Sequence, residues 1–166
     1  MKHSNRILFL LLLLNTSQVN AMGLFDFFTI HVFSPVTGVV TLNGEPVEGA
    51  EIVRTADHEE DKIYTDSVKS DIEGKFSFND ISTFSLRPIM LGTIIRQKII
   101  IKHNGYEYLA WRTVKHSNHK YGELNDKDNP EPIKLNLRCE LTDDQSKKRI
   151  VNLKYLNGIV VGLCEW

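Results

Sequence analysis

The sequence predicts an all-β protein, an antiparallel β-sandwich of roughly seven to nine strands. Three observations support this fold class. Apolar residues recur at every second position in nearly every periodic segment, which is the pattern of strands with one buried face. Asn-Gly pairs at 43–44, 104–105 and 157–158 suit tight turns between strands. No segment keeps a convincing helical period.

The N-terminal residues 1–21 have the pattern of a secretory signal peptide. Two basic residues precede an apolar run at 7–14 that is too short to cross a bilayer as a helix. We therefore expect export to the periplasm, with residues 22–166 forming one mature domain. Two alternatives stay open: the run is retained as an anchor helix, or translation starts at Met22 and leaves the product in the cytoplasm.

The charge balance argues against nucleic acid as a partner. The leader holds two basic residues and no acidic ones, so the remaining chain carries 18 basic and 21 acidic residues, a net charge of −3. Phosphate binding needs a basic stripe, which a mildly acidic chain does not suggest. We also expect no stable membrane anchor, because no second apolar run is long enough to span a bilayer and no cysteine follows the first.

Each strand of the first half follows from alternation and from the turn that ends it. The predicted strands are residues 28–33, 36–42, the segment after Pro46, 62–68 and 75–78. Asn43-Gly44 ends the second strand in a turn with positive φ. Ala50 and Ile52 then share the buried face of the next strand. Gly74 closes a turn that Asp71 can stabilise by bonding the backbone ahead of it.

The second half continues the same pattern around one long polar segment. The predicted strands are residues 94–103, 106–114, 133–139, 151–155 and 159–164. Asn104-Gly105 joins the first two as a hairpin. We expect residues 116–132 to be a long surface loop, because they are rich in Asn, Asp and Lys. Residues 142–148 suit a short helical turn or a loop.

Two stretches carry a resemblance to a known family. GVVTLNGEPVEGAEI at 38–52 and TDSVKSDIEGKFSF at 65–78 resemble the carboxypeptidase regulatory-like domain. That resemblance implies an immunoglobulin-like or transthyretin-like β-sandwich of the prealbumin type, used as an accessory module. It carries over no catalytic residue, because the shared positions are turn and core residues. The whole mature chain is similar to small proteobacterial proteins found beside type VI secretion effectors, which implies a protein partner.

The two cysteines, Cys139 and Cys164, predict a disulfide bridge. An even count in an exported chain is typical of such a bridge, and two buried free thiols are the alternative. Zinc binding is not expected, because neither cysteine has a C-x-x-C neighbour. His116 and His119 have a spacing that binds metal on a helix, but they fall in a polar loop. We therefore expect no metal and no cofactor.

The remaining chemistry favours binding over catalysis. The sequence lacks a G-x-S-x-G nucleophile elbow, a P-loop and an H-E-x-x-H zinc motif, so we expect no enzyme. An acidic cluster and nearby aromatic residues are the candidate contact surface for a partner. These candidates are Asp57, Glu59, Glu60, Asp61, Tyr108 and Trp111. Alternation predicts that Tyr108 and Trp111 lie on opposite faces of their strand.

The function that we expect is an exported, non-enzymatic binding protein. The sharpest hypothesis is a periplasmic immunity protein that occludes the active site of a secreted antibacterial toxin. The alternative is an envelope or surface module that binds a glycan or a protein.

Overall fold

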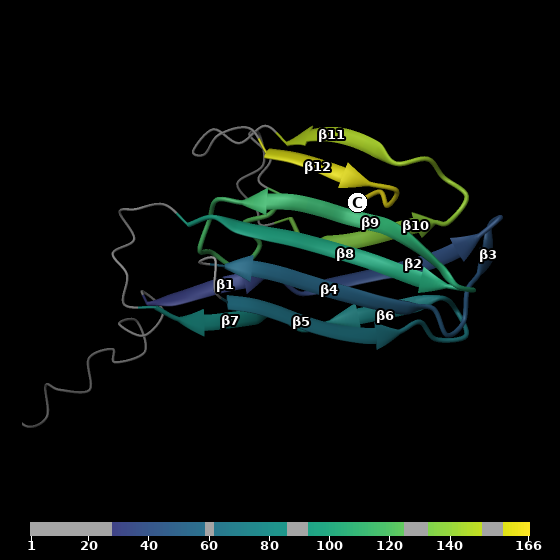
Figure 1. Ribbon diagram of the computed structural model, residues 1–166, viewed down its shortest axis with the longest axis horizontal. Helices are drawn as coiled ribbons and strands as arrows, with labels where there is room; N and C mark the ends of the chain where they lie inside the picture. Colours follow the sequence, from purple (N-terminus) through teal and green to yellow (C-terminus); the bar gives the residue numbers. More distant parts are fainter. Residues whose placement is uncertain (1–27, 59–61, 86–92, 125–132, 151–157) are drawn as a thin grey trace, which may run out of the picture.

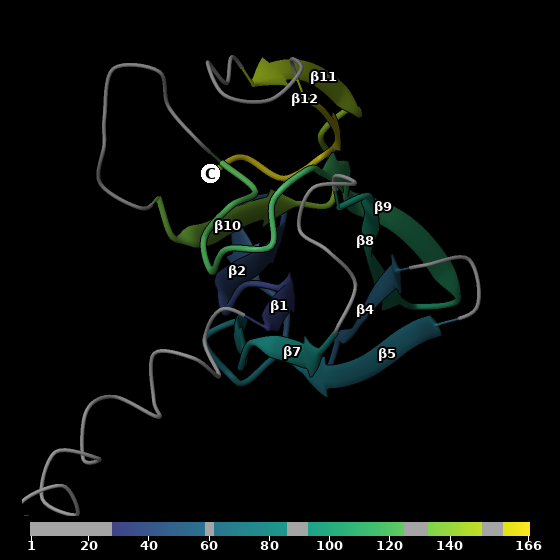
Figure 2. The same cartoon turned by 90° about the vertical axis from the view of Figure 1, so that its left-hand side faces the viewer.

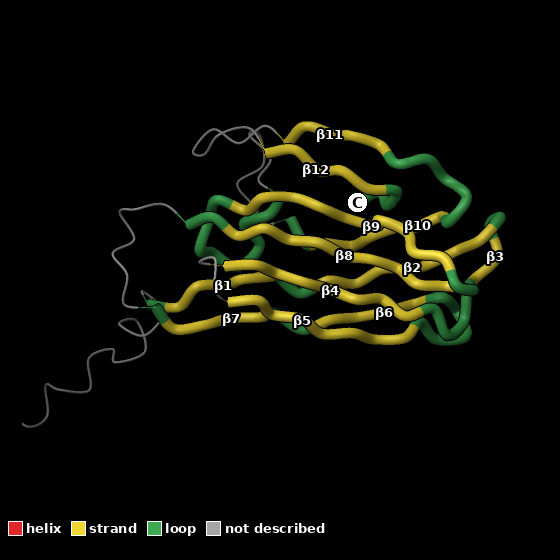
Figure 3. Tube along the Cα trace, in the orientation of Figure 1, coloured by secondary structure: helices red, strands yellow, loops and turns green. Residues whose placement is uncertain are grey.

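The computed structural model describes residues 28–58, 62–85, 93–124, 133–150 and 158–166. Every regular element in these residues is a β-strand, as the tube in Figure 3 shows. The predicted all-β sandwich is therefore confirmed, but the expected number of roughly seven to nine strands is too low, because the described residues form twelve. The signal peptide predicted at 1–21 and the strand predicted at 151–155 lie outside the described residues. Within the described ranges, no helix is long and apolar enough to span a membrane.

Twelve strands make up the described chain, and the alternating segments of the sequence account for most of them. The strands are β1 (Thr29–Phe33), β2 (Val36–Leu42), β3 (Glu45–Pro46), β4 (Glu51–His58), β5 (Lys62–Lys69), β6 (Lys75–Phe78), β7 (Ile81–Phe84), β8 (Ile95–His103), β9 (Tyr106–Lys115), β10 (Leu135–Glu140), β11 (Ser146–Ile150) and β12 (Gly158–Gly162). The prediction of a helical turn or loop at 142–148 is wrong for its second half, because β11 begins at Ser146 and pairs with β12.

The strands form two layers that face each other across one core (Figures 1 and 2). The larger layer is a six-stranded sheet in the order β11-β12-β9-β8-β4-β5. The opposite layer holds the sheet β10-β2-β3, in which β6 also pairs with β2, and the two-stranded pair β1-β7. All pairings between these strands are antiparallel except that of β10 with β2. The fold thus places a wide, regular sheet with its outer face toward solvent.

The core fills the space between the layers with alternate residues from each strand. Ile52, Ile99 and Leu137 have no exposed surface, and they come from strands on both sides of the core. Burying a side chain of this size contributes roughly 1.5–3 kcal/mol. The predicted burial of Ala50 and Ile52 on one face is confirmed.

The turn after β2 has the geometry that its Asn-Gly pair predicts. Asn43 has φ of 54° and Gly44 has φ of 82°, so both lie in the left-handed region. The carboxylate of Glu140, at the end of β10, accepts hydrogen bonds from the Asn43 and Gly44 amides at 2.8 and 2.9 Å. Two strands that are distant in sequence are thereby joined at this end of the sandwich.

The segment after β9 packs against the sandwich, so the prediction of a surface loop over 116–132 is wrong for its first part. Ser117, Glu123 and Leu124 are buried. His31 donates its backbone N–H to the Asn118 carbonyl at 2.9 Å, which ties the segment to β1. Residues 125–132 lie outside the described residues.

A disulfide joins Cys139 of β10 to Cys164, which follows β12, and this prediction is confirmed. The same connection carries two backbone hydrogen bonds of 2.8 Å between Arg138 and Glu165. Because β12 belongs to the large sheet, the bridge ties that sheet to the opposite layer. A bridge of this kind persists in an oxidising, exported environment.

Candidate functional site

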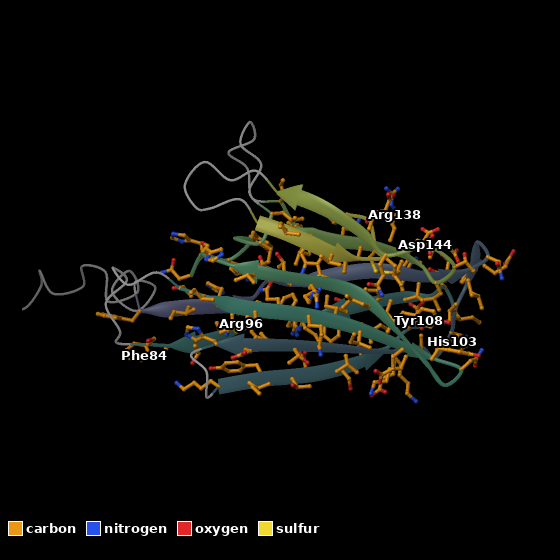
Figure 4. All side chains as sticks on the ribbon, turned by 45° about the horizontal axis from the view of Figure 1, so that its top comes forward. Phe84, Arg96, His103, Tyr108, Arg138 and Asp144 are labelled. Atoms are coloured by element: carbon orange, nitrogen blue, oxygen red, sulfur yellow. A yellow bond between two sulfur atoms is a disulfide. The ribbon has the colours of Figure 1, made fainter. Side chains whose placement is uncertain are left out.

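The predicted partner-binding residues do not form one surface in the described part of the chain. Asp57 is half-buried on β4, and its Oδ2 lies 3.5 Å from a guanidinium nitrogen of Arg96. Tyr108 lies at the opposite end of the large sheet from Arg96 (Figure 4). The other acidic candidates, Glu59, Glu60 and Asp61, lie outside the described residues.

Trp111 is a core residue, and it lies on the same face of β9 as Tyr108. The register pairs Ile99 with Trp111, Ile100 with Leu109 and Ile101 with Tyr108, so Ala110 is an extra residue in a β-bulge. A bulge shifts the side-chain alternation by one position. The prediction that Tyr108 and Trp111 face opposite sides is therefore wrong. Trp111 has no exposed surface, which leaves it unable to anchor a partner directly.

The histidines of the polar segment, His116 and His119, lie far from His103 of the large sheet. His103 ends β8 at the hairpin turn, whereas His116 and His119 follow the other end of β9. Among the described residues, no group of three or more His, Cys, Asp or Glu side chains is placed to hold a metal ion.

The outer face of the large sheet carries an open groove of about 430 Å³. Its lining comes from four neighbouring strands, β4, β8, β9 and β12. The residues that line it include Thr55, Asp57, Arg96, Lys98, Arg112, Val114, Ile159 and Val161. We call this hollow the sheet groove. Outward positions two residues apart on each strand supply its floor, because alternate side chains share one face.

Two cations stand together in the sheet groove. Lys98 lies directly opposite Arg112 in the β8–β9 register, and both side chains are exposed. Neither makes an ion pair with an acidic side chain in the part of the chain that the structure describes. Like charges placed directly opposite each other destabilise a sheet. The pair therefore keeps a local positive potential that an anionic group would relieve.

The next row of cross-strand neighbours in the sheet groove carries no unpaired charge and is partly aliphatic. Asp57 stands opposite Arg96 across β4 and β8, and their ion pair neutralises this row. Val114, opposite Arg96 on β9, is 39% exposed, and Ile159 of β12 is 41% exposed. The groove thus places an aliphatic patch beside the two unpaired cations.

Strand β12 supplies one wall of the sheet groove. It joins β9 through the ladder pair Val161–Arg112, and the Thr113 hydroxyl donates to the Ile159 carbonyl at 3.1 Å. Beyond the strand, Leu163 donates its N–H to the Leu109 carbonyl at 3.0 Å. The wall is therefore fixed by β9 on one side and by the disulfide at its end.

A buried polar cluster lies at the end of the sandwich, inside the layers. The Lys115 ammonium lies 3.1 Å from Glu123 Oε1 and donates to the His31 carbonyl at 2.8 Å. Glu123 also accepts from the Ser34 amide at 2.9 Å and from Gln97 Nε2 at 2.8 Å. The Lys115 and Glu123 side chains are 0% and 1% exposed. The cluster holds the segment after β9 in place and offers no opening to a ligand.

Opposing effects set the protonation of this cluster. Burial alone would raise the pKa of Glu123, but the Lys115 ammonium and hydrogen bonds from Ser34 and Gln97 outweigh it, so the pKa lies below its ordinary value. Burial lowers the pKa of Lys115, and Glu123 offsets part of that effect. Sequence patterns did not indicate this pair, because Glu123 sits in a polar segment with no periodicity.

A second hollow, of about 590 Å³, lies at the opposite end of the sheet, beside the β8–β9 turn. Its lining is polar and includes Glu51, Lys69, Lys102 and His103. Tyr106, the first residue after that turn, is 69% exposed. Its ring lies outside that lining, and the ring centroid is 6.5 Å from that of Tyr108.

Comparison with known proteins gives a family match. A family model described as "Domain of unknown function (DUF6795)" matches residues 36–144. The matched range begins with β2 and ends just after β10, so β12 and Cys164 lie beyond it. No curated protein and no solved structure matches the chain.

Proposed function

The chain belongs to this family, and we propose that it is an exported, non-enzymatic binding protein for a protein partner. The sheet groove is the observation that carries the proposal. Lys98 and Arg112 stand there without acidic partners among the described residues, beside an exposed aliphatic patch. Charges of this kind speed the encounter with a partner of opposite charge, and buried apolar contacts slow its release.

The periplasm is the compartment that we propose. The disulfide supports an oxidising environment outside the cytoplasm. The signal-peptide pattern of the first residues supports export in the same direction. Intact mass of the protein recovered from the periplasm should then start near Met22. Recovery of the full-length chain from the cytoplasm would contradict this compartment.

We propose further that the partner is a secreted antibacterial toxin and that the chain is its immunity protein. The mechanism is occlusion: a rigid sheet face covers the active site. The likeness of the sequence to proteins found beside type VI effectors supports a toxin partner. The basic sheet groove supports a toxin with carboxylates at its active site, such as the acidic pair that glycoside hydrolysis requires. An acidic active site is the opposite of what the acidic cluster near Asp57 suggests, because that cluster would complement a basic active site.

The decisive test is survival in competition. Cells that lack the gene should be killed by sibling cells that secrete the cognate toxin, and the exported form should rescue them. The same protein without residues 1–21 should fail to rescue, which would separate periplasmic from cytoplasmic action. If the deletion strain competes as well as its parent and no toxin co-purifies with the chain, the immunity function should be dropped.

An envelope-binding module is the second candidate, and the polar hollow beside the β8–β9 turn favours it. Its charged and polar side chains, such as Glu51 and Lys102, can accept from and donate to the hydroxyls of a sugar. Binding to purified cell-wall glycan that Glu51→Ala and Lys102→Ala each abolish would support this module. Glycan binding that both variants retain would exclude the hollow as the site.

A further inference from the structure

We propose that the sheet groove takes an extended segment of the partner that presents a carboxylate and, two residues later, an aliphatic side chain. This inference rests on the proposed protein-binding function and specifies the chemistry of the occupant. It follows from how two different surfaces, one cationic and one aliphatic, are spaced on the sheet.

The first surface is a carboxylate subsite. Lys98 and Arg112 are cross-strand neighbours, and the β-carbons of such a pair lie about 4.5–5.5 Å apart. A carboxylate that lies between them can accept from both, and the Arg112 guanidinium offers two parallel donors. The Asp57–Arg96 ion pair in the next row leaves little net charge there. The anion should therefore bind to the first row and not to the second.

The second surface is an aliphatic subsite. Val114, Ile159 and Val161 line the groove on the β9 and β12 side. Val161 shares a row with Arg112, and Val114 lies two residues farther along β9. Adjacent strands are about 4.8 Å apart and alternate residues about 6.6–6.8 Å apart, so the two subsites are separated by a similar distance.

That separation matches the repeat of an extended chain. In an extended segment, side chains at positions i and i+2 point to one side and lie about 6.6–6.8 Å apart. Side chains at i and i+1 point to opposite sides, so they cannot reach both subsites. An anionic membrane is a poorer match than such a segment, because a flat surface does not enter a hollow on the sheet.

The position of β12 adds a role for the C-terminal hairpin. The cationic subsite lies within the range matched by the family model, whereas Ile159 and Val161 lie beyond it. The aliphatic wall is thus contributed by a strand outside the matched range and is fixed by the disulfide. We therefore expect the hairpin to determine which side chain the groove accepts beside the carboxylate.

The test uses short threonine-based peptides and the folded full-length domain. One peptide carries a glutamate and, two positions later, a leucine; a second has the same composition with the two residues adjacent; a third replaces the glutamate with glutamine. Amide chemical shifts of the labelled protein report both affinity and location. We expect the spaced peptide to shift amides of β8, β9 and β12, and to bind roughly fivefold or more tightly than the other two.

Matched variants locate the two subsites. Lys98→Glu with Arg112→Glu should weaken binding of the spaced peptide roughly tenfold, and the milder pair Lys98→Gln with Arg112→Gln should weaken it less. Lys62→Glu with Lys69→Glu makes the same charge change on the edge strand β5 and should leave affinity within about twofold. Ile159→Ser should weaken binding, whereas Ile63→Ser, at an exposed position of β5, should not.

Several results would overturn the proposal. They are equal affinity for the spaced and adjacent peptides, shifts that map elsewhere, and binding to phosphatidylglycerol vesicles without binding to the peptides. Self-association that the Lys98→Glu and Arg112→Glu pair abolishes would assign the groove to a second copy of the chain. If the variant with both Lys98→Glu and Arg112→Glu still protects cells from the toxin, the groove is refuted as the binding site and the immunity function stands. If the peptide binds in the groove but the chain protects no cells, the immunity function is refuted and the groove stands as a binding site.

Discussion

Gly44 shows how one backbone angle can decide a turn. Its φ of 82° lies in the left-handed region, and apart from Gly44 and its two chain neighbours no described atom lies within 4 Å of the place where a β-carbon would stand. Gly44→Val should therefore cost about 1–3 kcal/mol of unfolding free energy through backbone strain, without a steric clash. The exposed neighbour Glu48 provides the control, and Glu48→Ala should change stability by less than about 0.5 kcal/mol. Thermal melts that rank the two variants the other way would refute the positive-φ argument.

Protonation of Glu140, at the turn after β2, should change the free energy of unfolding. Partial burial opposes its ionisation, but hydrogen bonds from the Thr142 hydroxyl and from the Gly44 and Thr142 amides lower its pKa to about 2. Because the folded pKa is lower than the ordinary value of 4.5, ionised Glu140 stabilises the fold above that value. The contribution should be lost as the pH falls from 4.5 toward 2.

Comparison of Glu140→Gln with the parent chain isolates this effect. The variant should be less stable at pH 7, and the difference should shrink as the pH falls through the same window. Denaturant unfolding at a series of pH values measures it. Glu45→Gln removes an exposed carboxylate at the same turn and is the control, with a change in stability of less than about 0.5 kcal/mol expected. A difference that stays constant down to pH 2 would show that Glu140 acts by packing alone.

The buried pair Lys115 and Glu123 should behave as one unit. Removing one partner leaves a charge without compensation, so Lys115→Met or Glu123→Leu alone should cost about 3–5 kcal/mol. The double variant should cost less than the two added together, by at least about 1 kcal/mol, because no lone buried charge remains. It should not regain full stability, since the Ser34 amide and Gln97 lose their acceptor. Strict additivity in urea unfolding would contradict the coupling.

At the scale of elements, the disulfide is the feature with the clearest stability effect. The bridge spans 25 residues, and closing a loop of that size in the unfolded chain contributes roughly 3 kcal/mol. Replacing Cys139 and Cys164 together with Ser should lower the unfolding free energy by about that amount, without creating a lone thiol. Denaturant unfolding of the oxidised parent and the double variant measures the difference. Equal stabilities would show that the bridge does not constrain the unfolded chain.

Alternation predicted the strands well and failed where one residue interrupts it. Ala50, Ile52 and Leu137 are buried as their period of two requires. The bulge at Ala110 has no signal in the sequence, because alanine is compatible with either face of a strand. The burial of Glu123 was likewise hidden, since its partners Lys115 and Ser34 come from other segments. In both cases the deciding contact is tertiary.

The sequence could predict only part of the sheet groove, because its lining also depends on tertiary contacts. The spacing of Arg96 and Lys98 shows that both lie on the solvent side of one strand. Their neighbours Arg112 and Ile159 belong to other strands, and the register that brings them together is not written in any local pattern. Net charge gave no indication of the groove, because the net charge of −3 over residues 22–166 is a sum that conceals the cationic row.

The whole molecule combines pairs of consecutive strands with pairings between strands that are distant in sequence. In the six-stranded sheet, β4-β5, β8-β9 and β11-β12 are consecutive, whereas β8 pairs with β4 and β12 with β9. The opposite layer depends on β10 for one side of β2. The C-terminal hairpin and the disulfide then join the two layers. The large sheet therefore forms the sheet groove. The position of β12, which forms one wall of it, also depends on the opposite layer through the disulfide.

The parallel pairing of β10 with β2 means that β2 is synthesised well before its partner strand. Thr37 and its neighbour Asn136 are 99 residues apart in sequence. At a synthesis rate of about 5–20 residues per second, β2 would wait roughly 5–20 s on the ribosome before β10 emerged beside it. During that interval the half-made layer has an open edge and an uncovered apolar face. The delay leaves that edge and that face accessible to chaperones and to misassembly with other nascent chains.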